Sequence, residues 1–311
     1  MPYPIATTPH GGAGTNPNPA YSGVFIPEIW SGKLIEKFYD TTVLAAISNT
    51  DYEGEIKNQG DKVKIRTRPS VTIKDYAANQ PLEIERPSSN IIEFTIDKGK
   101  YFNTILDDVM ETQSDMNLMS LWSDDASERM KIVLDTEVLA AMYAGVATQN
   151  KGATAGRKSG NLNLGIAATP RVVTKADVLD LIVQMGQALD EQNIPETGRW
   201  IVIPVWMAAM LKMSDLKNAY MTGDSVSPLR NGRLGMIDRF TIYSSNLLPV
   251  ASGNTTIFAG HKNGLTFASQ ISKVETLRSE STFGTLLRGL QVYGYSVIDG
   301  TSLVGAIVKP G

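Results

Sequence analysis

Apolar residues recur with helical periodicity in the second half of the chain. Between positions 174 and 193 they fall on one face of a helix: Val178, Ile182, Met185 and Leu189. Thr174 and Asp177 have the spacing of a capping box, which favours a helix start at this point. The pattern predicts an amphipathic helix over 174–193 whose apolar face packs against a core.

A longer helical pattern covers 107–145, with a break near Ser114. Its apolar residues form a rough stripe along one side: Met116, Met119, Ala126, Met130, Val133, Val138 and Met142. About thirty helical residues extend roughly 45 Å at ~1.5 Å per residue. We therefore predict a helix long enough to support the whole molecule.

Two shorter helices are predicted over 27–47 and 205–220. In the first, Pro27 suits the opening turn, and three apolar residues share a face: Trp30, Leu34 and Phe38. Residues 1–27 carry no Lys, Arg, Asp or Glu and are rich in Pro, Gly, Thr and Asn. Such a segment buries too little apolar surface to order itself, so it is either a flexible tail or an arm that orders against a neighbouring molecule.

Extended segments dominate 51–97. The stretches "KVKIRTR", "SVTIKDY", "LEIER" and "NIIEFTID" are separated by Pro, Asn and Gly, which predicts a long hairpin or small sheet. A two-stranded hairpin is marginal by itself, so we expect it to lean on another part of the molecule. Further strands are predicted at 199–204, 239–249, 255–270 and 303–309. Because they do not alternate regularly with helices, the fold class is expected to be α+β.

Four cations occupy every second position of the first extended segment: Lys62, Lys64, Arg66 and Arg68. In a strand they share one face, about 6.6 Å apart. Neighbouring pairs repel by roughly 2–3 kcal/mol at an effective dielectric near 20, or about 0.6 kcal/mol when fully solvated. Either Glu83, Glu85 and Glu93 pair with them across the hairpin, or the row faces an acidic helix of its own or a neighbouring chain.

One segment of the chain has the acidic composition expected of a helix that faces the cationic row. Positions 107–128 hold seven acids and no Lys or Arg: Asp107, Asp108, Glu111, Asp115, Asp124, Asp125 and Glu128. The helix dipole favours acids only within the first turn, so it does not account for the later ones. The segment is therefore a candidate partner for the cationic row.

Composition narrows the class of protein. The chain has 311 residues, 42% of them hydrophobic, a formal net charge of -3 and a pI of about 5.6. A general nucleic-acid binder usually shows a basic excess, which is missing here. There is no cysteine, which excludes disulfides and thiolate chemistry. No apolar run reaches ~18 residues, and no signal peptide pattern opens the chain, so we expect a soluble protein made in the cytoplasm, without membrane contact.

Catalytic motifs are not found. The two histidines, His10 and His261, make no pair for a metal, and a histidine-assisted nucleophile would depend on His261 alone. The stretch "GATAGRKSG", 152–160, departs from a phosphate loop because Arg157 replaces its second glycine. The acidic neighbours at 107–108 and 124–125 diverge by ~100° on a helix. We expect neither an enzyme nor a bound cofactor or metal.

Several segments together resemble the major capsid (coat) proteins of tailed bacteriophages. "PSVTIKDYAANQPLEIERPSSNIIEFTIDKGKYFNTILDDV" is similar to the extended loop of that family and its lead into a spine helix. "NGRLGMIDRFTIYSSNLLP" is similar to a passage of its axial domain. "NGLTFASQISKVETLRSESTFGTLLRGLQVYGYSVIDGTSLVGAIV" is similar to its peripheral strands and last axial strand. The resemblance covers most of 24–308.

The resemblance implies the fold of that family and a division of the chain. The implied parts are an N-terminal arm with a first helix (1–48), an extended β-hairpin loop (49–97), a peripheral domain with the spine helix (98–150), an axial domain (151–250), peripheral strands (251–292), and a final axial strand with the C-terminus (293–311). In such shells the loop reaches over the adjacent subunit near its spine helix. The implied inter-subunit contacts are Lys62, Lys64, Arg66 and Arg68 on one side and Asp124, Asp125 and Glu128 on the other.

The implied function is a structural subunit of an icosahedral shell. Copies would form pentamers and hexamers around double-stranded DNA, held without sequence-specific binding, in virions assembled in the host cytoplasm. Because the chain begins at Met1 with a short arm, we expect a separate scaffolding protein; a portal protein and a decoration protein are further expected partners. Alternatives are a cellular nanocompartment shell with the same fold, a nucleic-acid-binding protein and a hydrolase using His261.

Overall fold

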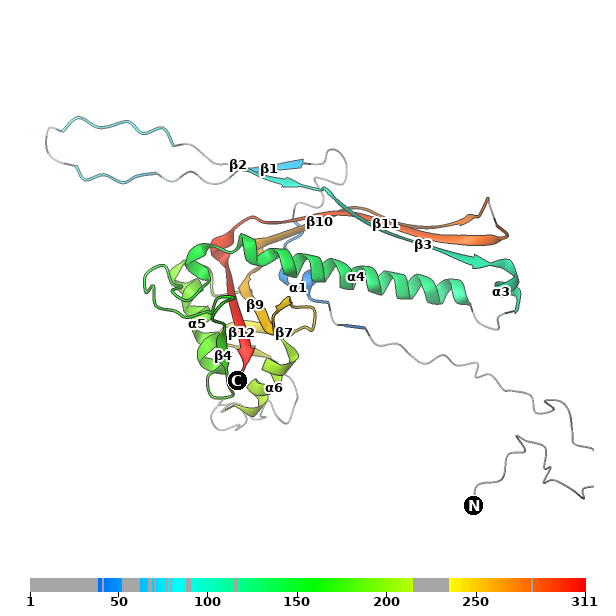
Figure 1. Cartoon of the computed structure of the whole chain (residues 1–311). Helices are drawn as coiled ribbons and strands as arrows, with labels where there is room; N and C mark the ends of the chain where they lie inside the picture. The colour runs from blue at the N-terminus through cyan, green and yellow to red at the C-terminus, as the bar shows by residue number, and fades with distance from the viewer. Residues whose placement is uncertain are drawn as a thin grey trace, which may run out of the picture. The chain divides into compact units, whose positions relative to one another are not determined.

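The computed structural model describes residues 39–40, 42–51, 62–66, 69, 71–76, 78, 80–87, 91–113, 117–214, 235–280 and 282–311. These residues all belong to one unit that spans Phe38–Gly311. Helices and strands are mixed without βαβ repetition (Figure 1), which confirms the α+β class.

A seven-stranded mixed sheet forms the larger part of the core. Its strands are β4 (Arg171–Val173), β5 (Arg199–Ile203), β6 (Met236–Ile237), β7 (Phe240–Ser244), β8 (Val250–Ala251), β9 (Asn254–His261) and β12 (Leu303–Pro310). The order is β4-β12-β9-β5-β7-β6, and β8 pairs with β9. β5 runs parallel to β7 and β12 parallel to β4, whereas the other pairs are antiparallel.

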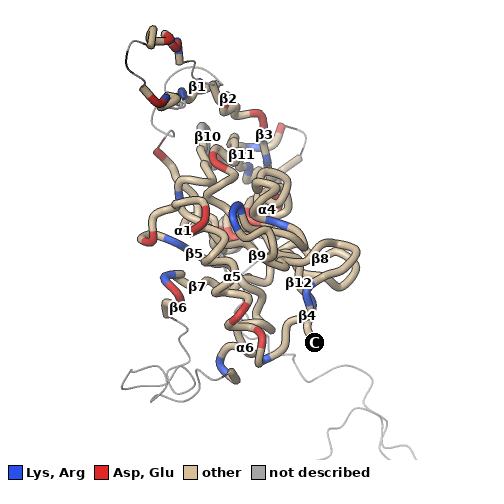
Figure 2. The backbone as a smooth tube through the Cα atoms, turned by 90° about the vertical axis from the view of Figure 1, so that its left-hand side faces the viewer, with Lys and Arg blue, Asp and Glu red and all other residues tan. Residues whose placement is uncertain are grey.

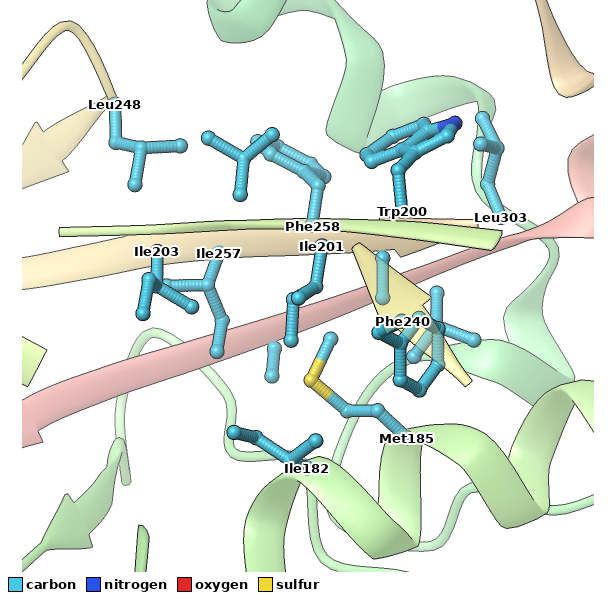
Figure 3. Packing of buried hydrophobic residues seen from close by; sticks show 14 of the residues in the cluster. Ile182, Met185, Trp200, Ile201, Ile203, Phe240, Leu248, Ile257, Phe258 and Leu303 are labelled. Atoms are coloured by element: carbon cyan, nitrogen blue, oxygen red, sulfur yellow. The ribbon is translucent and has the colours of Figure 1, made fainter. Parts of the chain in front are cut away.

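Helices cover both faces of this sheet. On one face Ile182 and Met185 of α5 (Val178–Glu191) approach Ile201 and Phe240 (Figure 3). On the other face Trp200, Phe258 and Leu303 pack with the C-terminal half of α4 (Leu118–Gly145), where the Tyr143 ring meets Phe258 edge-on at 6.5 Å. Because both faces are covered, every residue of β5 is buried.

A second sheet of three strands lies alongside α4 (Figure 1). It consists of β3 (Lys98–Asp107), β10 (Leu265–Arg278) and β11 (Gly284–Val297), in the order β10-β11-β3, all antiparallel. The two long strands β10 and β11 form a hairpin with an irregular register between Ser269 and Ile271. The sheet therefore supports α4 along its length.

The remaining elements are short. Among the described residues they are α1 (Leu44–Ile47), β1 (Lys62–Arg66), β2 (Ile91–Thr95), α3 (Asp108–Gln113), α6 (Val205–Met213) and the 3-10 turns η1 (Thr148–Asn150), η3 (Lys262–Gly264) and η4 (Gly300–Ser302). β1 and β2 form a two-stranded antiparallel sheet. Its inner side leans on a small cluster of Phe94, Ile96 and Ala268, as the marginal stability of an isolated hairpin led us to expect.

Several sequence predictions are confirmed. The helix expected over 174–193 forms at 178–191, and its predicted apolar residues are fully buried: Val178, Ile182, Met185 and Leu189. The strands expected near 199–204, 239–249 and 303–309 form as β5, β7 and β12. The segment expected at 255–270 comprises β9 and the start of β10, joined by η3.

Other predictions are wrong in detail. Asp107 ends β3 instead of beginning a helix, whereas the break expected near Ser114 is confirmed, because α3 ends at Gln113 and α4 begins at Leu118. Strand β3 was not predicted at all. Of the predicted stripe Val138 and Met142 are buried, whereas Val133 is 45% exposed because the N-terminal half of α4 is only partly covered.

The capping box is also a correction. Thr174 bonds the Asp177 side chain, and the cap of α5 at Asp177 makes no side-chain bond to the backbone. Segments 71–76 and 82–86 are extended but form no ladder. Of the helix expected over 27–47, positions 44–47 are helical and 42–43 are not, while 27–38 lie outside the described residues. The division into arm, loop, peripheral and axial domains stays a prediction. Within the segment 251–292, which was assigned to peripheral strands, β9 belongs to the seven-stranded sheet and not to the three-stranded one.

Candidate inter-subunit surface

The cationic strand has the predicted alternation. Lys64 and Arg66 are exposed, while Val63 and Ile65 are half-buried against the Phe94 cluster. The side chain of Lys62 and the whole of Arg68 lie outside the described residues. The described cations thus share one face of β1, because the apolar side chains between them hold the other face against the sheet.

One of the three expected acidic partners meets the cationic row. Lys64 pairs with Glu93 in register, with 3.7 Å between Nζ and Oε1 and side chains 66% and 51% exposed. Arg66 lies opposite Ile91 and has no ion-pair partner among the described residues. An exposed pair of this kind contributes about 0–1 kcal/mol, so the local ion pair holds the strand only weakly.

The other two acids bind further along the hairpin. Glu85 accepts hydrogen bonds from the Thr72 backbone at 3.0 Å and from its hydroxyl at 3.2 Å, and Glu83 pairs with Lys74. Both contacts continue the β1–β2 register without a shift. Acidic and basic residues consequently lie close together along this part of the chain (Figure 2).

The continued register gives the hairpin a second, apolar face. It places Ile73 opposite Ile84, and these residues are 91% and 92% exposed. Val71, 63% exposed, lies two residues before Ile73, and Leu82, 81% exposed, lies two residues before Ile84, so both share the face of the isoleucines. We call Val71, Ile73, Leu82 and Ile84 the distal apolar face. These four residues were not predicted as contacts, although the alternation of apolar with polar and charged positions was a sequence signal for this face.

Of the seven acids in the acidic segment, three form ion pairs with described residues of their own chain. Asp125 binds Arg129 at 2.8 Å and accepts from the Tyr39 hydroxyl at 2.8 Å. Glu128 binds Lys131 at 2.7 Å, and Asp108 binds Arg278. Asp124 is exposed and has no ion-pair partner among the described residues. The acidic composition of 107–128 did not reveal these partners, because Arg129 and Lys131 lie just beyond the segment and Arg278 lies far from it in sequence.

The N-terminal half of α4 offers two grooves. One, of about 660 Å³, lies between α4 and β3 and is lined chiefly by Tyr101, Ile105, Trp122, Met130 and Val133. The other, of about 650 Å³, lies between α4 and strands β10 and β11. No described residue of α4 before Leu134 is fully buried. We call the first the α4–β3 groove; its exposed Tyr101 and Ile105 were not singled out from the sequence.

The rejected catalytic features have structural explanations. In the "GATAGRKSG" loop the backbone N–H groups of Lys158 and Ser159 donate to Glu191, at 2.7 and 3.1 Å. Burial would raise the pKa of Glu191, but these bonds outweigh it and lower the pKa to about 2. The loop's donors are therefore satisfied by the chain's own carboxylate. His261 accepts from the Asn263 N–H at 3.3 Å, and burial lowers its pKa.

The described residues contain neither a metal-binding cluster nor a membrane-spanning helix. Within the described ranges, no three His, Cys, Asp or Glu side chains gather as metal ligands. Nor does any described helix combine the length and apolarity needed to cross a bilayer. The candidate site is thus a set of surfaces: the hairpin and the flanks of α4.

Comparison with known proteins defines the class. The chain is similar to a solved structure from Mycobacterium phage Che8, with 27% identity, 91% of this chain and 97% of that chain covered, and a TM-score of 0.77. It is also similar to the capsid structure of cyanophage P-SCSP1u (15% identity, 92% and 93% covered, TM-score 0.71) and to the mature capsid of bacteriophage PhiM1 (16%, 92% and 92%, 0.66). The fold is that of phage capsid subunits. A comparison with curated protein sequences gives no significant match.

A family model fixes the identification. The model described as phage capsid protein matches residues 92–306, more than two thirds of the sequence. The chain belongs to the phage capsid protein family. It is a structural protein of the virion, in agreement with the resemblance seen in the sequence.

Proposed function

We propose that this capsid protein forms pentamers and hexamers of an icosahedral shell that encloses double-stranded DNA without sequence-specific binding. A scaffolding protein, a portal protein and a decoration protein are its proposed partners, and assembly takes place in the host cytoplasm. The observation that carries the proposal is the distal apolar face, which the described part of its own subunit leaves uncovered.

The distal apolar face has the composition of a surface covered in an assembly. Fully burying one Val, Leu or Ile side chain contributes about 1.5–3 kcal/mol, so four such residues offer on the order of 5–10 kcal/mol before ordering costs. A rim ion pair offers about 0–1 kcal/mol. These magnitudes favour contact through the apolar face, with Lys64 and Arg66 contributing mainly to the choice of partner and orientation.

A second subunit supplies a fitting surface. We infer that the distal apolar face of one copy packs against the α4–β3 groove of the next, where Tyr101, Trp122 and Met130 present apolar surface. Lys100 of β3 and the paired Asp125 and Arg129 of α4 line this groove. The hairpin carries both charge signs at Lys74 and Glu83, so either orientation leaves charges to pair at the rim.

The test is a double substitution, Ile73→Asp with Ile84→Asp. We expect closed particles to disappear in negative-stain electron microscopy while the thermal midpoint of the unassembled subunit shifts by less than 2 °C, because neither side chain packs in its own subunit. Val250→Asp, on β8 and 64% exposed, is the matched control and should still assemble. Normal particles from the double variant would contradict the proposal.

The enclosed material is tested separately. Particles recovered from infected cells should contain double-stranded DNA, seen as a nucleic-acid absorbance ratio that survives nuclease treatment of intact particles. The formal charge of -3 per chain is consistent with a wall that holds DNA without binding it tightly. Particles filled with protein cargo and lacking DNA would instead identify a nanocompartment.

A further inference from the structure

The hairpin joins the three-stranded sheet through a close backbone crossing. β2 ends at Thr95 and β3 begins at Lys98, and between them the chain passes over Gly294 of β11. A Cβ atom at position 294 would lie 2.4 Å from the Thr95 carbonyl oxygen and 3.0 Å from the Ile96 Cα. Only glycine permits this approach. The crossing fixes a point on the hairpin, and a single fixed point leaves rotation about it free.

A carboxylate on α4 meets the chain directly after this crossing. Glu137 binds Lys98 Nζ at 3.1 Å and Lys100 Nζ at 3.0 Å, and both lysines lie at the start of strand β3. The hydroxyls of Tyr293 and Tyr295, on β11, donate to the same carboxylate at 2.9 and 3.5 Å. Lys98 also lies 5.0 Å from the centre of the Tyr295 ring. Four donors from two strands thus converge on one helix residue.

The electrostatics of this cluster keep it charged. Burial would raise the pKa of Glu137, but hydrogen bonds from Lys100, Lys98 and Tyr293 outweigh it and lower the pKa to about 2. The hydrogen bond to Glu137 raises the pKa of Lys98. Burial and then the bond to Glu137 raise the pKa of Tyr293. With its side chain 25% exposed, Glu137 is screened less than the rim pairs, so the cluster resists salt better than they do.

We propose that Glu137 is a positioning residue that fixes the direction of the hairpin relative to α4. The lever is long: from Thr95 to the tip is about 17 residues, at most ~55 Å at ~3.3 Å per residue. A rotation of about 5° at the root would move the tip by about 5 Å, a full strand spacing. This inference rests on the proposed function, because hairpin direction matters to the shell only if the hairpin reaches another copy.

The test uses Glu137→Gln, which keeps the side-chain shape and removes the charge. In the unassembled subunit we expect amide hydrogen exchange over 62–66 and 91–98 to accelerate at least tenfold, with exchange in β5 unchanged. In assembly reactions we expect particles of mixed diameter or open sheets in electron micrographs. Unchanged exchange, or particles of uniform wild-type diameter, would overturn the proposal.

Controls separate positioning from general stability. Glu275→Gln breaks ion pairs with Lys273 and Arg288 on the same sheet and no ion pair with α4, and should leave particle diameter uniform. If Glu275→Gln mis-assembles equally, Glu137 has no special role. If Glu137→Gln does not fold, Lys98→Met with Lys100→Met removes both ion pairs of Glu137 and should show the same exchange. If wild-type protein forms no shells, the proposed function fails, while the exchange experiment still decides the role of Glu137.

Discussion

At the scale of single residues, Asp135 is the buried charge with the clearest structural role. Its side chain, on α4, is 3% exposed, and Oδ2 accepts the backbone N–H groups of Val43 at 2.5 Å and Leu44 at 3.2 Å. The cap residue of α1, Val43, has no side-chain acceptor of its own, so a carboxylate from another helix satisfies these donors. No sequence pattern indicated this contact, because Val43 and Asp135 lie 92 positions apart.

Asp135 leads to a prediction with a definite pH dependence. Burial raises the pKa of Asp135, and the two backbone bonds only partly offset it. A raised folded-state pKa means that the favourable contribution is present below the unfolded pKa and is lost as pH rises through the folded pKa. Asp135→Asn keeps an acceptor without the charge, so its free energy of unfolding should exceed that of wild type at pH 7, and the difference should vanish below about pH 4.

The matched variant is Asp135→Leu. It leaves two buried N–H groups without an acceptor, each costing about 1–3 kcal/mol. Denaturant unfolding at pH 7 should therefore show a loss of about 2–5 kcal/mol. A destabilised Asp135→Asn at pH 7, or a harmless Asp135→Leu, would contradict this account of the contact.

At the scale of elements, periodicity predicted what a single element decides and missed what depends on pairing. The α5 face was found because four apolar residues repeat every three or four positions and all are buried. The alternation in β1 was found because charged and apolar residues occupy every second position within that one strand. Segments 71–76 and 82–86 form no ladder although their side chains bond across the hairpin, because two extended arms without a third packed element are only marginally stable. β3 was missed because its sequence leads directly into a helical pattern.

The distal hairpin should therefore gain structure on assembly. Between Val71 and Arg86 the described backbone has no ladder bonds, so we expect most of its amides to exchange rapidly in the free subunit. Covering the distal apolar face should slow exchange over 71–86 by at least a hundredfold in closed particles, whereas α5 should change little. Exchange that is equally fast in particles and free subunits would show that the hairpin stays uncovered.

At the scale of the whole molecule, the sequence indicated the family and the fold, whereas the inter-subunit contacts stay a prediction. The family, the fold and the presence of an extended hairpin could be read from the order of segments. The apolar hairpin face that we propose as the contact could not, because the four cations are conspicuous in sequence while the apolar residues beyond them look like ordinary strand positions. The partners of Asp125 and Glu128 at 129 and 131 lie just outside the segment that was counted.

Charge reversal on the hairpin tests the lesser contribution. Lys64→Glu with Arg66→Glu should lower particle yield at 50 mM salt several-fold, because the reversed row meets its neighbour with the wrong sign. At 500 mM salt the deficit should shrink, since exposed charges are screened within about 5 Å. The thermal midpoint of the free subunit should barely move. A salt-independent loss as severe as that of the Ile73/Ile84 double variant would show that charge, and not apolar burial, dominates the contact.

The unshifted register of the hairpin limits how its length can be changed. Removing one residue from each arm would turn Ile73 and Ile84, or whatever replaces them, toward the opposite side. Removing two from each arm restores the orientation and shortens the reach by about 6.6 Å. Anyone re-engineering the spacing between subunits should therefore trim or lengthen both arms in steps of two.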